Sequence, residues 1–238
     1  MQFSDSANKG GLVELIDANV GTNSISYSIE DKTRDINLAL DRVFSLIFSV
    51  GGTWQFDDSN HTDYPIITTD LVSGQRDYSF VTDGAGNFVL DIYKVLVDDG
   101  TGVFKEIFPV DQQTIAPDNY LDGKNLGNIP NTYDKTGNGI FLDPIPNYNA
   151  TGGLKILINR TGSYFIKTDT TKKPGFAPLF HEYLALRPSY QYAYRKNLAN
   201  ANVLKAEMNE MEQALITHYD SREKDSRKVL QGKYRSAR

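Results

Sequence analysis

The sequence predicts an α+β protein in which a helical bundle formed by both chain ends carries an inserted antiparallel β-domain, a small sandwich or barrel. Apolar residues recur at helical spacing near both ends of the chain. Between them, runs rich in Val, Ile, Tyr and Phe alternate with glycine- and asparagine-containing turns, as short strands do. A length of 238 residues fits one elaborated domain or two small ones.

The clearest element is a helix predicted over residues 29–50. Ser28 and Asp31 resemble a capping box, and Gly51 with Gly52 ends the helix. The apolar residues that share one helix face are Ile36, Leu40, Val43, Phe44, Ile47 and Val50. Residues 1–28 are predicted to form an N-terminal arm, in which residues 11–20 have room for two helical turns.

The inserted β-domain is predicted over residues 53–173. Its candidate strands are residues 76–81, 88–97, 104–110, 139–142 and 154–159. The turn DDGTG at residues 98–102 predicts a hairpin between the second and third strands. We expect the last two strands to pair with each other around a turn rich in proline and glycine.

Helical spacing returns after Pro174. Residues 29–52 and 174–222 are therefore predicted to form the bundle, because the early helix must bury its apolar face against the later helices. We expect Pro188 to bend the helix that follows Pro174 near its middle, and residues 197–202 permit either a turn or a second bend.

The net charge of −5 is unevenly distributed. Residues 226–238 contain five basic residues and no acidic one, which leaves −5 − 5 = −10 on residues 1–225. An acidic body repels DNA phosphate, so the whole molecule is not predicted to bind duplex DNA. Residues 223–238 form a basic C-terminal tail, which is either a solvated chain end or a segment that grips an acidic partner.

Composition and motifs argue against several functional classes. The chain has no Cys, its three His show no metal-ligand spacing, and no glycine loop precedes a helix in a phosphate-binding pattern. No apolar stretch is long enough to cross a membrane, and the first residues lack the features of a secretory signal. We therefore predict no catalytic residues, metal or cofactor, no membrane partner, and a protein that is not an enzyme.

Tyrosines crowd one predicted helix of the C-terminal region. Core packing explains any single ring, but Tyr190 and Tyr192 diverge by about 200° around the helix, so the two rings cannot face the same neighbour. Tyrosine is favoured at protein interfaces because it combines apolar area with a polar tip. Tyr190, Tyr192 and Tyr194 are therefore candidate inter-subunit contacts.

Several segments, taken in order, resemble the head–tail connector (adaptor or neck) proteins of tailed bacteriophages. Residues 74–80 (GQRDYSF) resemble a G-x-x-x-Y-x-L strand, and residues 95–97 (VLV) a V-x-V strand. Residues 130–133 (PNTY) and 139–146 (GIFLDPIP) resemble P-x-x-Y followed by G-x-I-x-L-x-P-x-P. Strand 154–160 and the helical C-terminal region complete a resemblance that extends over about residues 30–220.

The resemblance implies a structural virion protein located in the neck, between the capsid portal and the tail, and made in the host cytoplasm. Its subunits would form a homo-oligomeric ring, commonly a dodecamer, through which genomic DNA passes without tight binding. The helices would make the ring contacts, and the β-domain would face a tail or nozzle protein. The tail would dock on the portal protein through Arg227, Lys228, Lys233, Tyr234, Arg235 and Arg238.

Two other functions remain open at this point. The chain could be a glycan- or receptor-binding β-module of a tail fibre or baseplate, with Tyr120 or Tyr148 stacking on sugars. It could also be a hydrolase that uses paired carboxylates, whose separation is spatial and cannot be read from spacing along the chain.

Overall fold

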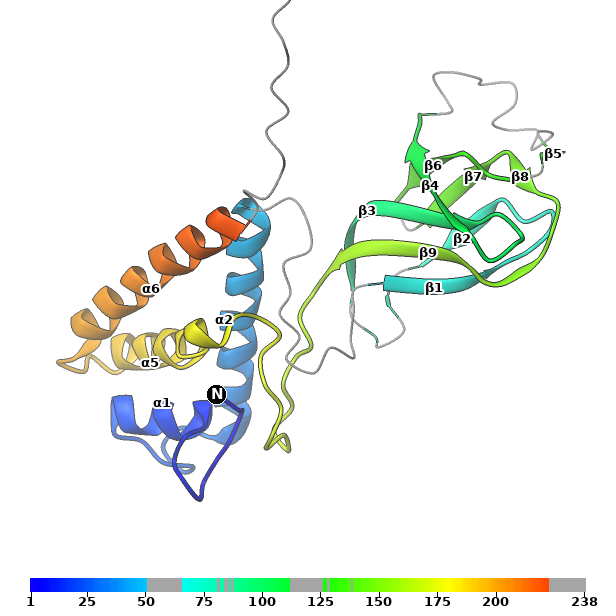
Figure 1. Ribbon diagram of the computed structural model, residues 1–238. Coiled ribbons are helices and arrows are strands. Elements are labelled where there is room, and N and C mark those ends of the chain that lie inside the picture. Colours follow the sequence, from blue (N-terminus) through cyan, green and yellow to red (C-terminus); the bar gives the residue numbers. More distant parts are fainter. Residues whose placement is uncertain are drawn as a thin grey trace, which may run out of the picture.

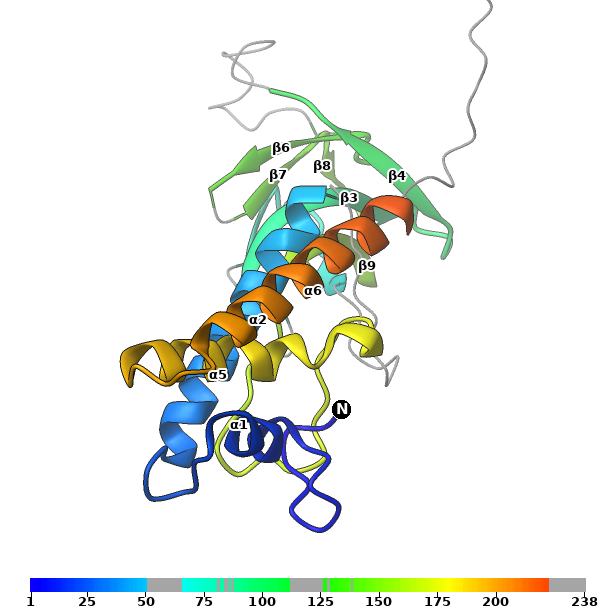
Figure 2. The same ribbon diagram turned by 90° about the vertical axis from the view of Figure 1, so that its left-hand side faces the viewer.

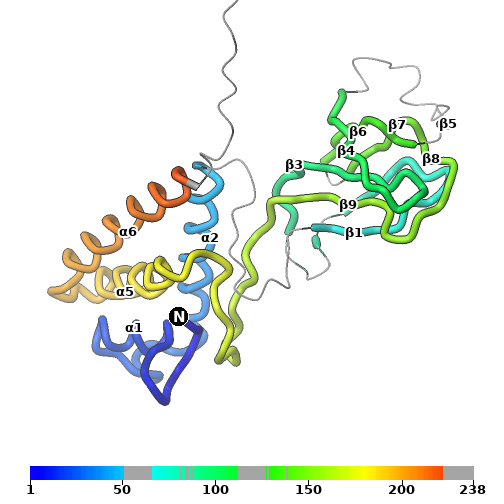
Figure 3. Tube along the Cα trace, in the orientation of Figure 1, coloured from blue at the N-terminus to red at the C-terminus, as the bar shows by residue number. Residues whose placement is uncertain are grey.

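The protein has two lobes with separate hydrophobic cores (Figure 1). The computed structural model describes residues 1–50, 66–80, 82–83, 86, 88–111, 126–127, 129–137 and 139–222. We call residues 1–50 and 161–222 the helical lobe, and residues 66–160 the β lobe. After β9 (Ala150–Arg160) the chain leaves the β lobe and returns to the helical lobe beside α2 (Figure 3).

The helix predicted over residues 29–50 is confirmed, because α2 spans Ile29–Val50. Ser28 precedes it and makes the expected local contacts. The Asp31 N–H donates to Ser28 Oγ at 3.1 Å, and the Ser28 hydroxyl donates to Asp31 Oδ2 at 2.9 Å. The predicted apolar face is buried, since Ile36, Leu40, Val43 and Ile47 lie in the core of the helical lobe.

The predicted bundle is wrong. The α-helices described are α1 (Leu12–Val20), α2, α5 (Tyr183–Arg195) and α6 (Ala201–Arg222), with a 3₁₀ turn η1 (Pro178–Phe180) before α5. They contribute to one core, but they cross one another instead of running alongside as in a bundle (Figures 1 and 2). Helix α5 packs against α1, α2 and α6, and both views show it lying across the long helix α2.

The segment predicted as an N-terminal arm is packed into this core. Phe3, Leu12 and Ile16 are fully buried, and the Phe3 N–H donates to the Lys172 carbonyl oxygen at 2.8 Å. The residues that follow β9 also belong to the helical lobe and not to the β-domain predicted over residues 53–173. The Asn37 side chain on α2 exchanges two hydrogen bonds of 2.9 Å with the backbone of Phe165.

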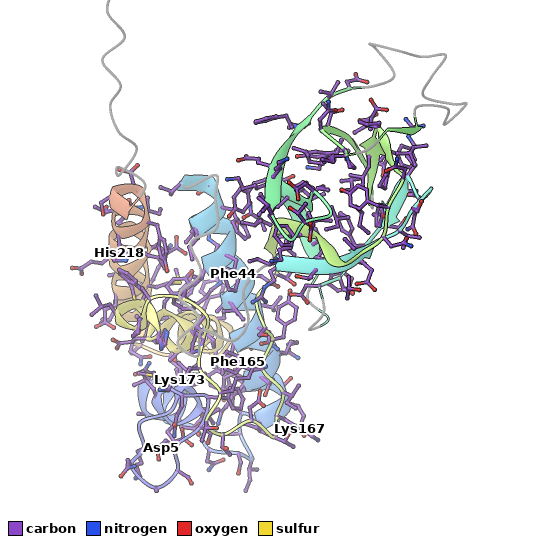
Figure 4. The ribbon with its side chains drawn as sticks, turned by 45° about the vertical axis from the view of Figure 1, so that its right-hand side comes forward. Asp5, Phe44, Phe165, Lys167, Lys173 and His218 are labelled. Atoms are coloured by element: carbon purple, nitrogen blue, oxygen red, sulfur yellow. The ribbon has the colours of Figure 1, made fainter. Side chains whose placement is uncertain are left out.

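Aromatic side chains fill the space between these segments. Phe44 on α2 and Phe165 lie where the chain runs alongside α2 (Figure 4). The ring of Phe165 stacks on that of Phe3, with 5.1 Å between centroids. A Cβ at Gly162 would lie 2.0 Å from the Phe44 ring, so this crossing requires a residue without a side chain.

The predicted antiparallel sandwich or barrel is also wrong, because the β lobe is one curled, mixed sheet that forms a half-barrel. Its strands are β1 (Ile66–Leu71), β2 (Asp77–Ser79), β3 (Val89–Asp98), β4 (Phe104–Pro109), β6 (Thr132–Thr136), β7 (Gly139–Asp143) and β9, in the order β1-β9-β3-β4-β6-β7-β2. Strands β4 and β6 are parallel. A separate two-stranded sheet of β5 (Leu126–Gly127) and β8 (Ile145–Pro146) is parallel as well.

Local strand and turn signals were more reliable than long-range pairing. The hairpin predicted at residues 98–102 is confirmed, since β3 and β4 pair antiparallel across it. The predicted pairing of residues 139–142 with 154–159 is wrong, because β7 pairs with β6 and β2, whereas β9 pairs with β1 and β3. Both edge strands, β1 and β2, meet near the turn between them, where the Val72 N–H donates to the Tyr78 hydroxyl oxygen at 2.9 Å.

Gly139 is expected to be intolerant of any side chain. It pairs with Ser79 on β2, and a Cβ there would lie 2.6 Å from the Tyr78 carbonyl oxygen and 3.1 Å from Ser79 Cα. We predict that Gly139→Ala lowers the free energy of unfolding by about 1–3 kcal/mol, because the two backbones must separate. Gly137→Ala is the matched control, since a Cβ at Gly137 has no atom within 4 Å. Equal urea midpoints for the two variants would contradict this reading.

His181 is expected to make stability depend on pH. It is buried, its Nε2 lies 2.9 Å from the Phe176 carbonyl oxygen, and burial lowers the pKa of the ring to about 4. Between pH 6.5 and pH 4 the His181 ring is protonated in the unfolded chain but stays neutral in the folded protein. The free energy of unfolding should therefore fall by up to about 3 kcal/mol between pH 6.5 and pH 4. Urea titrations at pH 7 and pH 5 should show this slope, and His181→Gln should reduce it.

Candidate subunit-contact surfaces

The three tyrosines predicted as inter-subunit contacts have different surroundings. Tyr192 is half-buried and stacks on Tyr27, with 4.6 Å between ring centroids. Tyr190 is half-buried against the core of the helical lobe. Tyr194 is 68% exposed, and its only ring contact among the described residues is with Tyr190, at 6.1 Å. Of the three, only Tyr194 is mostly free to meet another molecule.

Tyr194 belongs to a shallow groove of about 550 Å³ between α2 and the last two turns of α5. We call this groove the aromatic face; its residues are Arg34, Asp35, Leu38, Tyr190, Gln191, Tyr194 and Arg195. Leu38 is 51% exposed and adds apolar area next to the tyrosines. Large exposed apolar side chains close together are typical of protein-contact surfaces.

A buried carboxylate organises the aromatic face. Asp35 is 3% exposed and accepts hydrogen bonds from the Tyr27 hydroxyl at 2.5 Å, Arg195 Nη2 at 2.9 Å and Arg34 Nε at 3.0 Å. Burial raises the pKa of Asp35, but these three hydrogen bonds outweigh burial and lower it. The ionised carboxylate therefore holds two guanidinium groups on the surface, and both arginine side chains remain about half exposed.

Asp35 also accepts a hydrogen bond from Tyr27, whose ring stacks on that of Tyr192. The pKa of the Tyr27 hydroxyl is raised, first by burial and then by its hydrogen bond to Asp35. The Tyr27 hydroxyl thus remains a hydrogen-bond donor, and the Tyr27 ring stacks on that of Tyr192 in α5. The aromatic face is consequently a preorganised surface, with positions set by contacts between α2 and α5.

A second groove, of about 400 Å³, lies between α6 and the beginning of α5. We call it the acidic groove; its residues are Leu179, Phe180, Glu182, Leu186, Glu207, Glu210, Met211 and Ala214. Leu179 is 78% exposed at its rim. Glu182, Glu207 and Glu210 are exposed, and none of the three forms an ion pair with any residue that the structure describes.

The acidic groove and the aromatic face lie at opposite ends of α5. Glu182 immediately precedes α5 and Leu186 lies in its first turn, whereas Tyr194 and Arg195 belong to its last turn. The 13 residues of α5 span about 20 Å at 1.5 Å per residue. Figure 2 shows α5 running from right to left across the helical lobe, so that its two ends lie on opposite sides of this lobe.

The sequence pattern alone does not predict the three glutamates of the acidic groove. Glu207 and Glu210 stand three residues apart on α6, which was a visible signal for a shared helix face. Their relation to Glu182 depends on how α6 packs on α5, which spacing along the chain does not reveal. The candidate portal-docking residues of the tail lie outside the described residues.

The residues proposed for other chemistry show no site within the described part of the chain. Tyr148 is half-buried, donates its hydroxyl proton to the Asp98 carbonyl oxygen at 2.5 Å, and lies against Gly100, while Tyr120 lies outside the described residues. No group of three metal-ligating side chains gathers in the ranges described. Among the described helices, none is long and apolar enough to cross a membrane.

Comparisons with protein-family models and with curated proteins give no match.

Proposed function

We propose that this protein is a structural subunit of a head–tail connector ring of a tailed bacteriophage, which docks under the portal and joins it to tail components around the DNA channel. The observation that carries the proposal is where the motif segments lie in the sheet. Residues 74–80 contain β2, residues 130–133 lead into β6, and residues 139–146 contain β7 and β8. Strand β7 pairs with both β2 and β6.

This arrangement supports the resemblance because segments far apart in the sequence become one group of neighbouring strands. Tyr78 pairs with Ile140 and Tyr133 pairs with Leu142, and these four side chains are buried in the β core. The two motif tyrosines thus flank the motif strand β7 from opposite sides. The motif segments resemble those of the connector family by their order along the chain, and in the fold they share one role, because together they form the core of this half of the sheet.

The surface of the helical lobe supports assembly into a ring. Leu179, in the 3₁₀ turn that precedes α5, and Tyr194, in the last turn of α5, are large and mostly exposed. A ring repeats one contact between two different surfaces, and closure adds to the stability of each contact. The helical lobe therefore offers two surfaces of the kind that ring subunits use, in a protein for which we propose no catalytic role, metal or cofactor.

The charge distribution suits the two expected partners. Residues 1–225 carry −10, so a channel lined by this protein repels DNA phosphate and lets the genome pass without tight binding. The tail that follows α6 carries the opposite charge, and we assign it to the portal protein. The β lobe then faces a tail or nozzle protein, which places the ring in the neck of the virion.

The proposal is tested by mixing the full chain with its cognate portal protein and imaging the product by negative-stain electron microscopy. We expect a ring of this protein, of twelve subunits, seated on the portal, with the stoichiometry confirmed by native mass spectrometry. A chain that remains monomeric with portal present, or a threefold assembly that binds glycans, would contradict it.

Portal docking by the tail is tested separately. A chain that ends at Asp225 lacks the five basic residues, and we expect it to lose portal binding while its circular dichroism and melting curve stay unchanged. A matched variant with these five residues replaced by Gln keeps the tail length and should lose binding too. Undiminished docking by either variant would assign the contact to the helices instead.

A further inference from the structure

We propose that the acidic groove of one copy receives the aromatic face of the next copy, so that the ring is built by a head-to-tail contact between these two surfaces. The occupant of the acidic groove is therefore a second copy of this chain. This inference rests on the proposed function, because it specifies which surfaces make the ring contact.

Charge complementarity favours a second copy as the partner. Glu182, Glu207 and Glu210 place three carboxylates in the acidic groove without an ion-pair partner among the described residues. On the aromatic face, Arg34 and Arg195 share the buried carboxylate of Asp35, and Arg34 also pairs with Asp31 at 2.6 Å, yet about half of each arginine side chain stays exposed. Guanidinium groups bind carboxylates in a planar, two-bonded geometry, so the spare N–H groups of one surface match the unpaired oxygens of the other.

The apolar parts of the two surfaces are also complementary. Tyr194 projects from the aromatic face beside Leu38, whereas Leu179 and Met211 border the acidic groove. A groove of about 400 Å³ has room for one aromatic ring together with its flanking side chains. We expect the Tyr194 ring to insert there, with the arginines and glutamates forming a charged rim around it.

The placement of the surfaces determines the type of assembly. They differ in composition and lie at opposite ends of α5, so a contact between them leaves one free surface on each copy of the pair. Such a contact is heterologous, and it produces a ring when the rotation from one copy to the next closes. A twofold dimer would require one surface to contact itself, which three unpaired carboxylates disfavour.

Disulfide trapping tests the contact directly, because the chain has no Cys of its own. The variant that carries both Glu207→Cys and Tyr194→Cys is mixed with portal protein, oxidised and separated on a non-reducing gel. We expect a ladder of covalent oligomers that extends beyond the dimer and disappears on reduction. Each single-Cys variant should give no ladder, and a double variant that gives none would overturn the inference.

A mixing experiment tests the head-to-tail geometry. The groove variant carries Glu207→Lys and Glu210→Lys, and the face variant carries Tyr194→Glu. All three positions are exposed, so folding should be unchanged in circular dichroism. Each variant alone should remain monomeric by analytical ultracentrifugation. Their mixture should stop at the dimer, because only one intact groove and one intact face can meet.

A control and two contrasting outcomes separate this inference from the proposed function. Val203→Glu, which alters an exposed α6 residue outside both surfaces, should assemble normally. If the wild type forms rings on the portal and both variants form the same rings, the inference is wrong and the proposed function stands. If the wild type forms oligomers that both variants abolish, but these oligomers do not bind the portal, the proposed function is wrong and the inference stands. A disulfide ladder that is absent from the full-length double-Cys chain and appears only when the chain ends at Asp225 would also overturn the inference, because it would show that the tail, not the neighbour's face, occupies the groove of the full chain.

Discussion

Asp35→Ala is expected to lower the free energy of unfolding by about 2–4 kcal/mol, because it removes the acceptor shared by the buried Tyr27 hydroxyl and two half-exposed guanidinium groups. Tyr27, Arg34 and Arg195 all donate to this one carboxylate, which joins α2 to α5. Without it, a buried hydroxyl loses its partner and two like-charged groups face each other. Chemical denaturation at pH 7 measures the change.

Asp35→Asn is the matched variant, because it keeps the shape and one acceptor oxygen while it removes the charge. We expect it to lose less stability than Asp35→Ala. The hydrogen bonds to Asp35 lower its pKa, so the stability that they supply is present above the ordinary pKa of about 4 and is lost as pH falls below it. The difference between wild type and Asp35→Ala should therefore shrink below pH 4. A difference that is equal at pH 7 and pH 3 would contradict an electrostatic role.

The same substitution is informative about assembly. Asp35 positions the guanidinium groups of the aromatic face, so under the proposed ring contact Asp35→Asn should weaken the association of subunits in addition to its effect on stability. Ring formation measured at a temperature where both proteins are fully folded separates the two effects. Normal association of a folded Asp35→Asn protein would show that the arginines do not depend on this carboxylate for their contact.

Tyr219→Ala is expected to cost about 3–5 kcal/mol of unfolding free energy, because it opens a large cavity under the end of α6. Tyr219 is fully buried, its ring meets that of His218 at 5.2 Å, and its hydroxyl oxygen accepts the Ala177 N–H at 3.0 Å. It thus fastens the last turn of α6 to the residues that precede α5. Thermal unfolding followed by circular dichroism measures the loss.

Tyr219→Phe separates packing from hydrogen bonding. It keeps the ring and leaves the Ala177 N–H without this acceptor, so we expect a loss of about 1–2 kcal/mol. Under the proposed docking of the tail on the portal protein, Tyr219→Ala should also reduce that binding at temperatures where the protein remains folded, because the tail follows α6. Equal stability of Tyr219→Ala and wild type would show that the end of α6 contributes little to the fold.

The sequence predicted best where the cause of the structure is local. The α2 helix follows from a capping residue at Ser28, a regular apolar spacing and a pair of glycines at its end. The β3–β4 hairpin follows from a short turn between two apolar runs. In both cases the determining residues lie within one or a few turns of each other along the chain.

The predictions were wrong where a strand or helix packs against a segment that is distant along the chain. Strand β6 follows β4 only after a long connection, and a long connection allows parallel pairing that a short turn forbids. Strand β7 was assigned to β9 because both have a suitable apolar pattern, yet that pattern is equally compatible with β2 and β6. Likewise, burial of Phe3 and Phe165 depends on the core that α2 and α5 create.

The candidate contact surfaces divide in the same way. Spacing around the helix identified the tyrosines of α5 as too many for one face, and the charge count identified the basic tail. Which tyrosine is exposed, and which glutamates share a groove, was decided by the crossing of α5 with α2 and α6. By itself the sequence determined the long helices, the strands β2, β3, β4, β7 and β9, and the uneven charge, because backbone propensity and patterning act over a few residues. Only the tertiary structure decided the mixed sheet, the crossed helices and the two surfaces, because each depends on side chains that are distant along the chain competing for the same buried space.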